Sequence, residues 1–250
     1  MRTLVISDIH GNIDALKAIQ EPFDAVICLG DIVDYGPDPG ACIDWLTNLT
    51  PPLTRVRGNH DNAVAFHKDC GCGQAFKHLS TITREYMWKV LDDKQLEWTG
   101  APNTNARLEL KDSLSIYATH AAPSDNLFKY LVPETSDEDL AAELELAGTD
   151  IVLTGHTHKP FMRELNGRLM VNVGSVGQPR DSIPRASYAI IEDGLVELKR
   201  VDYDVAAAVA KLRALPLDPK TVRELAYILE HADTPPKKPD DDFLPQCKCI

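Results

Sequence analysis

Five short apolar runs, each followed within a few residues by side chains able to bind a metal ion, constrain this chain more than any other feature. The runs span residues 4–6, 25–29, 53–56, 114–118 and 151–153. The side chains that follow them are Asp8, His10, Asp31, Asn59, His120, His156 and His158. Such runs are typical of buried strands, and the carboxyl ends of parallel strands meet at one edge of a sheet. A single Asp-x-His would more often be a cap or a turn, but the repeated pattern predicts a metal site.

The segments between these runs indicate an α/β fold. Apolar residues recur at helical spacing in 13–19, 43–46 and 76–90, and Ser136 begins a capping box ahead of a further helix. Later runs at 169–173, 188–191 and 195–201 have no long helix between them, which predicts the hairpin half of a sheet. Two amphipathic helices, at 205–215 and 221–230, are expected to cover the body. We therefore predict two packed β-sheets flanked by helices.

Composition is that of an ordinary globular chain. The 250 residues are 44% hydrophobic and 26% charged, enough for one domain over residues 1–232. Residues 233–250 combine prolines with blocks of like charge, which predicts a disordered tail. The opening apolar run is too short for a signal-peptide core or a membrane span, so we expect a cytoplasmic protein with no membrane contact.

The net charge of −12 argues against stable binding of nucleic acid through its phosphates. A small phosphorylated substrate, such as a nucleotide, is compatible with it, because bound cations would make the pocket locally positive. The sequence carries no sign of the oligomeric state.

Four of the six cysteines form two short pairs, Cys70 with Cys72 and Cys247 with Cys249. Four thiolates can bind zinc. One pair lies in an apparent insertion and the other at the end of the chain, so reduced thiols are expected and a shared zinc site is disfavoured. The role of the pairs is left open.

The mixture of imidazole and carboxylate ligands favours first-row ions such as Mn, Fe, Zn or Ni over calcium. A carboxylate can also bridge two such ions. The spacing itself indicates only that the ligands converge, and says nothing of how they divide between ions.

The order of the ligand blocks resembles that of the calcineurin-like metallophosphoesterases over roughly residues 1–193. The resemblance rests on Asp8-Ile9-His10, Gly30-Asp31, Gly58-Asn59-His60, His120, Gly155-His156-Thr157-His158 and the stretch 172–180. Within that superfamily the chain looks most similar to small bacterial phosphodiesterases and dinucleoside polyphosphate hydrolases. The resemblance implies an α/β/β/α sandwich and two divalent ions, with manganese or iron favoured.

The resemblance also implies how the ligands divide. One ion would be held by Asp8, His10, Asp31 and His158. The other would be held by Asp31, Asn59, His120 and His156, with Asp31 bridging the two. A hydroxide between the ions would attack a phosphodiester or a nucleotide phosphoanhydride, for example that of a diadenosine polyphosphate.

His60 is implied as the proton donor to the leaving group, with Asp34 as the carboxylate that orients it. Turn capping is the alternative for both residues. The protein phosphatases of the superfamily read Gly-Asp-x-x-Asp-Arg-Gly where this chain has Tyr35 in place of the arginine, which disfavours protein phosphatase activity.

Tyr35 is expected to line the pocket and stack on a nucleobase, with simple packing as the alternative. Arg57, Arg180 and Arg185 are expected to contact substrate phosphates, with local ion pairs as the alternative. A phosphomonoesterase and a catalytically silent metal-binding scaffold are the competing functions. The presence of every ligand position favours an enzyme.

Overall fold

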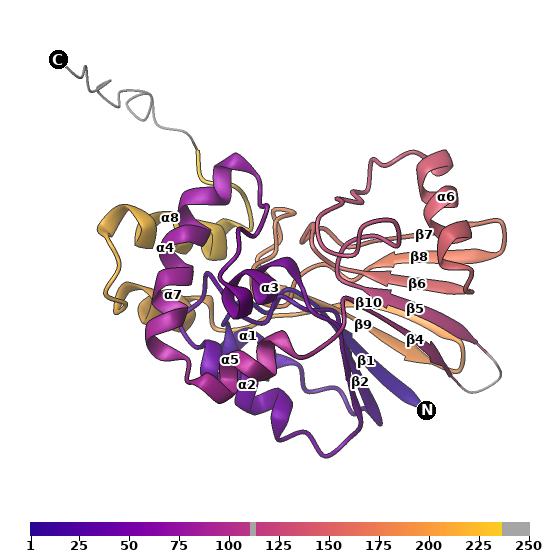
Figure 1. Cartoon of the computed structure of the whole chain (residues 1–250), viewed down its shortest axis with the longest axis horizontal. Helices are drawn as coiled ribbons and strands as arrows, with labels where there is room; N and C mark the ends of the chain where they lie inside the picture. Colours follow the sequence, from indigo (N-terminus) through magenta and orange to yellow (C-terminus); the bar gives the residue numbers. More distant parts are fainter. Residues whose placement is uncertain (111–113, 237–250) are drawn as a thin grey trace.

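Two five-stranded sheets pack face to face in the computed structural model, which describes residues 1–110 and 114–236 (Figure 1). The first sheet has the strand order β10-β9-β1-β2-β3 and the second β4-β5-β6-β8-β7. The strands of the first are β1 (Arg2–Ile6), β2 (Ala25–Cys28), β3 (Leu53–Arg55), β9 (Ala186–Glu192) and β10 (Leu195–Val201). Those of the second are β4 (Asn105–Glu109), β5 (Ser115–Thr119), β6 (Ile151–Thr154), β7 (Phe161–Leu165) and β8 (Arg168–Asn172). The predicted pair of packed sheets is confirmed.

The central strands are buried on both faces because successive side chains point to opposite sides of a sheet. In β1, Val5 joins the core between the sheets, whereas Leu4 and Ile6 join the core under the helices. Strands β1, β2 and β3 are parallel to one another, and so are β5, β6 and β8. The carboxyl ends of each parallel set therefore open at one edge.

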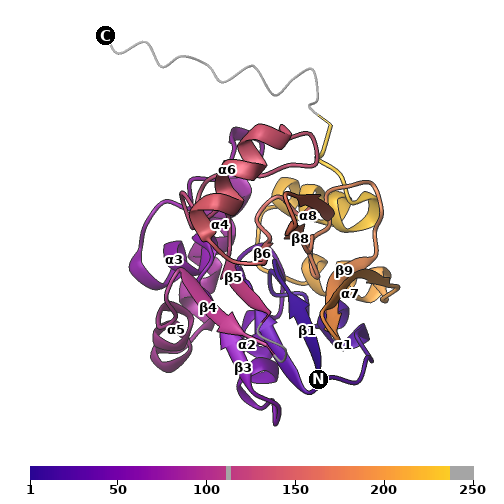
Figure 2. The ribbon, with the colours of Figure 1, turned by 90° about the vertical axis from the view of Figure 1, so that its right-hand side faces the viewer.

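Helices cover the outer face of each sheet (Figures 1 and 2). The outer face of the first sheet shares a core with α1 (Ile13–Ala18), α2 (Pro39–Thr47), α3 (Asn59–Phe66), α4 (Gln74–Val90) and α5 (Asp93–Gly100). The outer face of the second packs on α6 (Asp137–Ala147), whose N-cap Ser136 accepts a hydrogen bond from the Asp139 amide. Helices α7 (Val205–Arg213) and α8 (Pro219–His231) pack on each other and on α1 and α4.

The prediction of one hairpin half was wrong in part. Strands β9 and β10 do form a hairpin, which extends the first sheet antiparallel to β1. Strand β8 lies instead in the second sheet, parallel to β6 and antiparallel to β7. The apolar pattern of β8 is buried in either sheet, so periodicity did not distinguish them. Edge strands β4 and β7 were missed because they are only partly buried and lack a continuous apolar run.

In the described part of the chain, no helix is long and apolar enough to cross a membrane. The disordered tail predicted from residue 233 falls outside the described residues from 237 onward, as does the Cys247 and Cys249 pair.

Candidate metal centre

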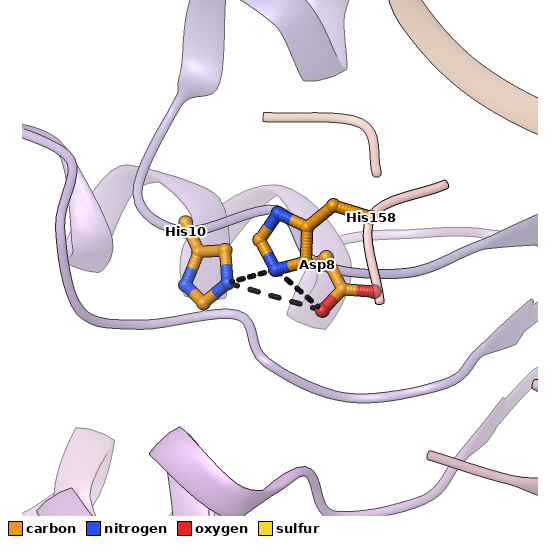
Figure 3. Close-up of side chains that lie close together, drawn as sticks. All are labelled: Asp8, His10 and His158. Carbon is orange, nitrogen blue, oxygen red and sulfur yellow. Dashed lines mark hydrogen bonds and ion pairs between the residues drawn. The ribbon is translucent and has the colours of Figure 1, made fainter. Parts of the chain in front are cut away.

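The predicted metal ligands lie at the carboxyl ends of β1, β2, β3, β5 and β6. Asp8, His10 and His158 form one group, in which the ligand atoms all lie within 4.8 Å of one another (Figure 3). His158 Nε2 is 3.2 Å from Asp8 Oδ1 and 3.3 Å from His10 Nε2. Side chains from two strands of different sheets are thus directed at a single point.

A second group lies beside the first. Asp31, His120 and His156 also have their ligand atoms within 4.8 Å of one another. His120 Nε2 is 3.2 Å from Asp31 Oδ2 and 2.9 Å from the amide oxygen of Asn59. The Asn59 amide nitrogen donates to the carbonyl of Cys70, which keeps the oxygen turned toward the group.

Asp31 faces both groups. Its Oδ2 lies 3.2 Å from His120 Nε2 and 3.8 Å from His10 Nε2. Asp31 Oδ2 and Asp8 Oδ1 are buried and accept no hydrogen bond from the residues that the structure describes. Leaving a buried carboxylate oxygen unpaired is costly, and a cation would remove that cost. The donor set therefore fits divalent ions.

Backbone carbonyls fix the orientation of three rings. Nδ1 of His10 is 2.9 Å from the Val33 carbonyl, Nδ1 of His120 is 2.9 Å from that of Leu29, and Nδ1 of His158 contacts that of Gln178. An Nδ1–H that donates to a carbonyl leaves the Nε2 lone pair for a metal. His156 is reversed, because its Nε2 lies 3.3 Å from the Phe128 carbonyl and Nδ1 remains for an ion.

The ligands sit on strained backbone. Positive φ values occur at Asp8, His10, Asp31, His156 and His158. Such conformations cost free energy in non-glycine residues and persist where surrounding structure enforces them, commonly at functional sites. Glycines give the ligands room: a Cβ at Gly58 would lie 2.0 Å from Asp31 Oδ1, and one at Gly155 would lie 2.5 Å from Asp8 Oδ2.

The stretch 172–180 supports this backbone. Ser175 Oγ donates to the Asp8 carbonyl at 2.7 Å, and the Gly177 amide donates to the same carbonyl at 3.0 Å. Asn172 donates from its side chain to the Gly155 carbonyl at 2.6 Å. The stretch therefore ties the β1 and β6 turns together.

The protonation of the two carboxylates and of His156 suits metal binding. Burial lowers the pKa of His156 to about 3. Burial also opposes ionisation of Asp8 and Asp31, but the neighbouring histidines outweigh it and hold both pKa values below the usual range. The carboxylates are therefore charged, as a metal ligand must be. Burial likewise opposes charge on His120, yet Asp31 raises the pKa of that ring to about 9, so a metal ion at this group must displace a proton from His120.

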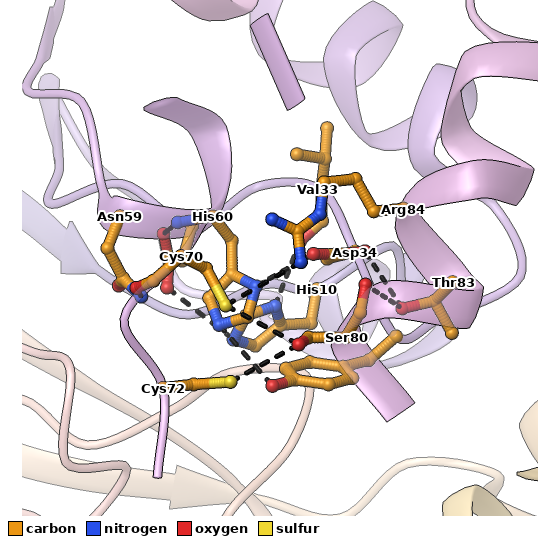
Figure 4. A network of polar contacts seen from close by, with 12 residues as sticks. His10, Val33, Asp34, Asn59, His60, Cys70, Cys72, Ser80, Thr83 and Arg84 are labelled. Atoms are coloured by element: carbon orange, nitrogen blue, oxygen red, sulfur yellow. Dashed lines mark hydrogen bonds and ion pairs between the residues drawn. The ribbon is translucent and has the colours of Figure 1, made fainter. Parts of the chain in front are cut away.

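His60 and Asp34 form a buried pair, and the His60 ring lies beside His10 (Figure 4). His60 Nδ1 is 2.8 Å from Asp34 Oδ2, and the other Asp34 oxygen accepts from Thr83 Oγ1 at 2.8 Å. Burial disfavours charge on His60, but the carboxylates of Asp31 and Asp34 raise the pKa of the ring to about 9. The pair thus holds a proton on the ring, with Nε2 turned away from Asp34.

Sequence reasoning missed Asp61, in the first turn of α3. Its two carboxylate oxygens accept the backbone amides of Asp31, Ile32, Val33 and Gly58. Burial raises the pKa of this carboxyl to about 6, and the charge of Asp31 adds to the shift. Asp61 therefore holds the turn that carries Asp31. An acidic residue at the third position of a helix is the local signal that could have found it.

Tyr35 does not lie where a base could stack on it, which corrects that prediction. The residue is 1% exposed, and its ring packs at 4.8 Å from the rings of both His10 and His60. It joins the core of Leu79 and the α7 and α8 helices. Its hydroxyl lies 3.4 Å from His60 Nε2, so Tyr35 contacts the pair of His60 and Asp34 rather than a base.

Two of the three predicted phosphate-binding arginines point elsewhere. Arg57 donates to the carbonyls of Gly100 and Pro102, and Arg185 pairs with Asp202 at 2.9 Å. The guanidinium groups of Arg57 and Arg185 are thus bound by nearby acceptors, which is the alternative of local pairing that the sequence left open.

Arg180 stays beside the centre. Its guanidinium lies 3.8 Å from the centroid of Phe76 and 5.7 Å from that of Tyr35. Burial and then the charge of Arg180 lower the pKa of His158, so the guanidinium acts on the ligand group electrostatically.

Cys70 and Cys72 lie close to the same region. Their sulfurs are 3.4 and 3.2 Å from Ser80 Oγ. The other pair, Cys247 and Cys249, lies outside the described residues, so the structure does not test a zinc site shared by the two pairs.

Comparison with known proteins agrees with this geometry. The family model for the calcineurin-like phosphoesterase superfamily domain matches residues 1–193. The uncharacterized protein MJ0912 of Methanocaldococcus jannaschii is 31% identical over 231 residues, which cover 83% of this chain and 90% of the relative. The phosphodiesterase YfcE of Escherichia coli K12 is 25% identical over 224 residues, which cover 84% and 98%. The crystal structure of a metallophosphoesterase from Sphaerobacter thermophilus matches with a TM-score of 0.75 at 28% identity, covering 90% of this chain and 98% of that one.

Fold, site and relatives define a metal-dependent phosphoester hydrolase. The chain belongs to the calcineurin-like phosphoesterase superfamily.

We expect manganese to raise the melting temperature of the metal-free protein. An ion that binds only the folded chain stabilises it by about 4 kcal/mol at a thousandfold excess over its Kd, or roughly 10 °C for a chain of this size. Scanning fluorimetry of chelator-treated protein with and without Mn²⁺ measures the shift. Calcium is the control, since histidine-rich groups favour first-row ions. An equal shift with calcium, or none with manganese, would contradict the assignment.

Proposed function

We propose that the protein hydrolyses phosphodiesters or the phosphoanhydrides of nucleotides, such as a diadenosine polyphosphate, with two divalent ions held on either side of Asp31. Both ions are proposed to be manganese or iron, because the mixed histidine and carboxylate donors favour first-row ions. The observation that carries the proposal is the buried Asp31 Oδ2, which accepts no hydrogen bond from the described residues and faces His10 Nε2 on one side and His120 Nε2 on the other. A carboxylate oxygen so placed suits a ligand shared by two ions.

When bound, such ions activate water and polarise phosphoryl oxygens. The residues of the chain supply the remaining chemistry. As the phosphorus–oxygen bond to the leaving group breaks, that oxygen needs a proton, and His60 Nε2 carries one. Asp34 holds the opposite ring nitrogen and Thr83 holds Asp34, so the ring is fixed in position and in its protonated form.

A diester or anhydride is preferred over a phosphoprotein because the loop after Asp31 carries Tyr35 and not an arginine. Tyr35 is buried and carries no positive charge, so its side chain cannot bind the additional negative charge of a phosphomonoester as an arginine would. The similarity to a relative named as a phosphodiesterase supports the same preference.

Arg180→Ala is expected to raise KM for the diester about tenfold and to leave the metal content unchanged, because the guanidinium supplies positive charge beside the centre without being a ligand. Arg185→Ala, five residues along, removes a guanidinium that pairs with Asp202 and should leave KM unchanged. Initial rates against substrate concentration give both values. Similar effects of the two substitutions would remove Arg180 from substrate binding.

The test of the function compares initial rates of manganese-loaded protein on bis-p-nitrophenyl phosphate and p-nitrophenyl phosphate, with Asp31→Ala as the blank. We expect turnover above the blank and a higher kcat/KM on the diester. A higher value on the monoester would favour a phosphomonoesterase. Binding of two ions without turnover on either substrate would favour a scaffold.

A further inference from the structure

Two large aromatic side chains are exposed at the edge of the metal centre. Tyr130 is 43% exposed and Phe128 is 41% exposed, in the loop between β5 and α6. The Tyr130 ring lies 4.1 Å from the ring of His156, and the Phe128 carbonyl contacts the Nε2 of the same histidine. Scattered exposed apolar side chains are ordinary, but an exposed aromatic ring in contact with a predicted metal ligand is placed to meet a substrate bound there.

The loop that carries these rings is anchored. Glu143 of α6 accepts from the Ser124 amide and pairs with Lys129, the residue before Tyr130. Leu131, the residue after it, is 2% exposed and packs in the core of the second sheet and α6. The backbone on both sides of Tyr130 is therefore held, and the ring is presented without the loss of loop entropy on binding.

The Phe128 ring rests on the opposite loop. A Cβ added to Gly71 would lie 2.9 Å from its Cδ1, so the ring packs directly on the glycine backbone between Cys70 and Cys72. Of the two rings, Tyr130 is thus the one in contact with a predicted metal ligand. Tyr35, buried in the core, offers no surface for stacking.

We propose that Tyr130 determines specificity by stacking on a planar aromatic substituent of the phosphate, such as a nucleobase. The proposal rests on the proposed function, since the stacked group must belong to a phosphoester held at the centre. An aromatic face accepts any base, and alanine substitution of a stacking aromatic commonly costs about five- to 150-fold in affinity.

The test uses two diesters with the same leaving group, thymidine 5′-(p-nitrophenyl phosphate) and methyl p-nitrophenyl phosphate. We expect Tyr130→Ala to lower kcat/KM on the thymidine ester by about fivefold or more and on the methyl ester by less than about twofold. Tyr130→Phe keeps the ring and should match the wild type on both. Phenyl p-nitrophenyl phosphate tells whether Tyr130 favours a nucleobase or any aryl group. If Tyr130→Ala loses as much kcat/KM on the phenyl ester as on the thymidine ester, any aryl group stacks. If it loses less on the phenyl ester, the preference is for a nucleobase.

Tyr227→Ala is the matched control. Tyr227 also packs on a histidine ring, at 4.3 Å from His231, but on helix α8. Tyr227→Ala should leave kcat/KM unchanged on both the thymidine ester and the methyl ester. An equal loss on the thymidine and methyl esters with Tyr130→Ala would mean that the ring only supports His156, and no loss on the thymidine ester would also overturn the proposal.

Calorimetry separates this proposal from the proposed function. Thymidine 5′-monophosphate should bind manganese-loaded Tyr130→Ala at least about fivefold more weakly than it binds the wild type, while inorganic phosphate binds both alike. If wild type hydrolyses neither ester above the Asp31→Ala blank, the proposed function fails, but this difference still measures stacking. Equal binding of the nucleotide to both proteins would refute the role of Tyr130.

Discussion

Asp31→Asn is expected to lose both metal ions and to lower turnover on the order of a thousandfold or more, since the ions contribute several kcal/mol to transition-state stabilisation. The asparagine keeps the size of the side chain and an oxygen that can accept the His60 amide, as Asp31 Oδ1 does at 2.9 Å. It loses the negative charge that faces both ligand groups. Elemental analysis and initial rates on the diester measure the two effects.

Asp44→Asn is the control for Asp31→Asn, because it makes the same change at an exposed carboxylate on α2. It should keep the wild-type metal content and rate. Circular dichroism shows whether each variant is folded. Retention of two ions by folded Asp31→Asn would refute the shared ligand, and retention of one ion would confine Asp31 to a single group.

His60→Ala is expected to keep its metal ions and to lower turnover by about two to four orders of magnitude on substrates with a poor leaving group. The imidazole is not one of the expected ligands, and its loss removes the proton that the departing alkoxide needs. On p-nitrophenyl esters, whose leaving group departs without a proton, the loss should be about tenfold or less. Rates on two phosphodiesters that differ only in the leaving group, one an alkyl group and the other p-nitrophenyl, measure the two losses.

Two further variants test the role of His60. His78→Ala removes a half-exposed histidine that pairs with Glu224, and should leave both rates unchanged. Asp34→Asn removes the charge that orients His60 and should give an intermediate loss with the same dependence on the leaving group. A loss with His60→Ala that is equal for good and poor leaving groups would exclude proton donation.

The ligand blocks could be predicted because each depends on local sequence. An apolar run ends at Ile6 and a metal-binding side chain follows at Asp8, and parallel strands bring such ends together. The packed sheets follow from the same runs. The turns are a different matter. Asp and His adopt a positive φ more often than most residues, but the sequence does not indicate which of them do so. At Asp8 the conformation goes with a hydrogen bond from its amide to the Gly30 carbonyl, 22 residues away.

The contacts that sequence reasoning missed join residues far apart in the chain. Thr83 contacts Asp34 across 49 positions, and Tyr130 reaches His156 from a loop with no apolar periodicity. The prediction for Tyr35 failed for a related reason. A tyrosine in a loop of glycine and proline looks exposed, but Tyr35 is buried by α7, α8 and Leu79 together with the rings of His10 and His60. Tertiary packing decides these positions, whereas local pattern decides the strands.

The most direct test of the two-ion proposal is a titration of metal-free protein with Mn²⁺. Bound manganese and diester hydrolysis are measured on the same samples. We expect binding to saturate at two ions per chain and turnover to appear only as the second is bound. Full turnover with one ion per chain, or turnover in metal-free protein, would contradict it.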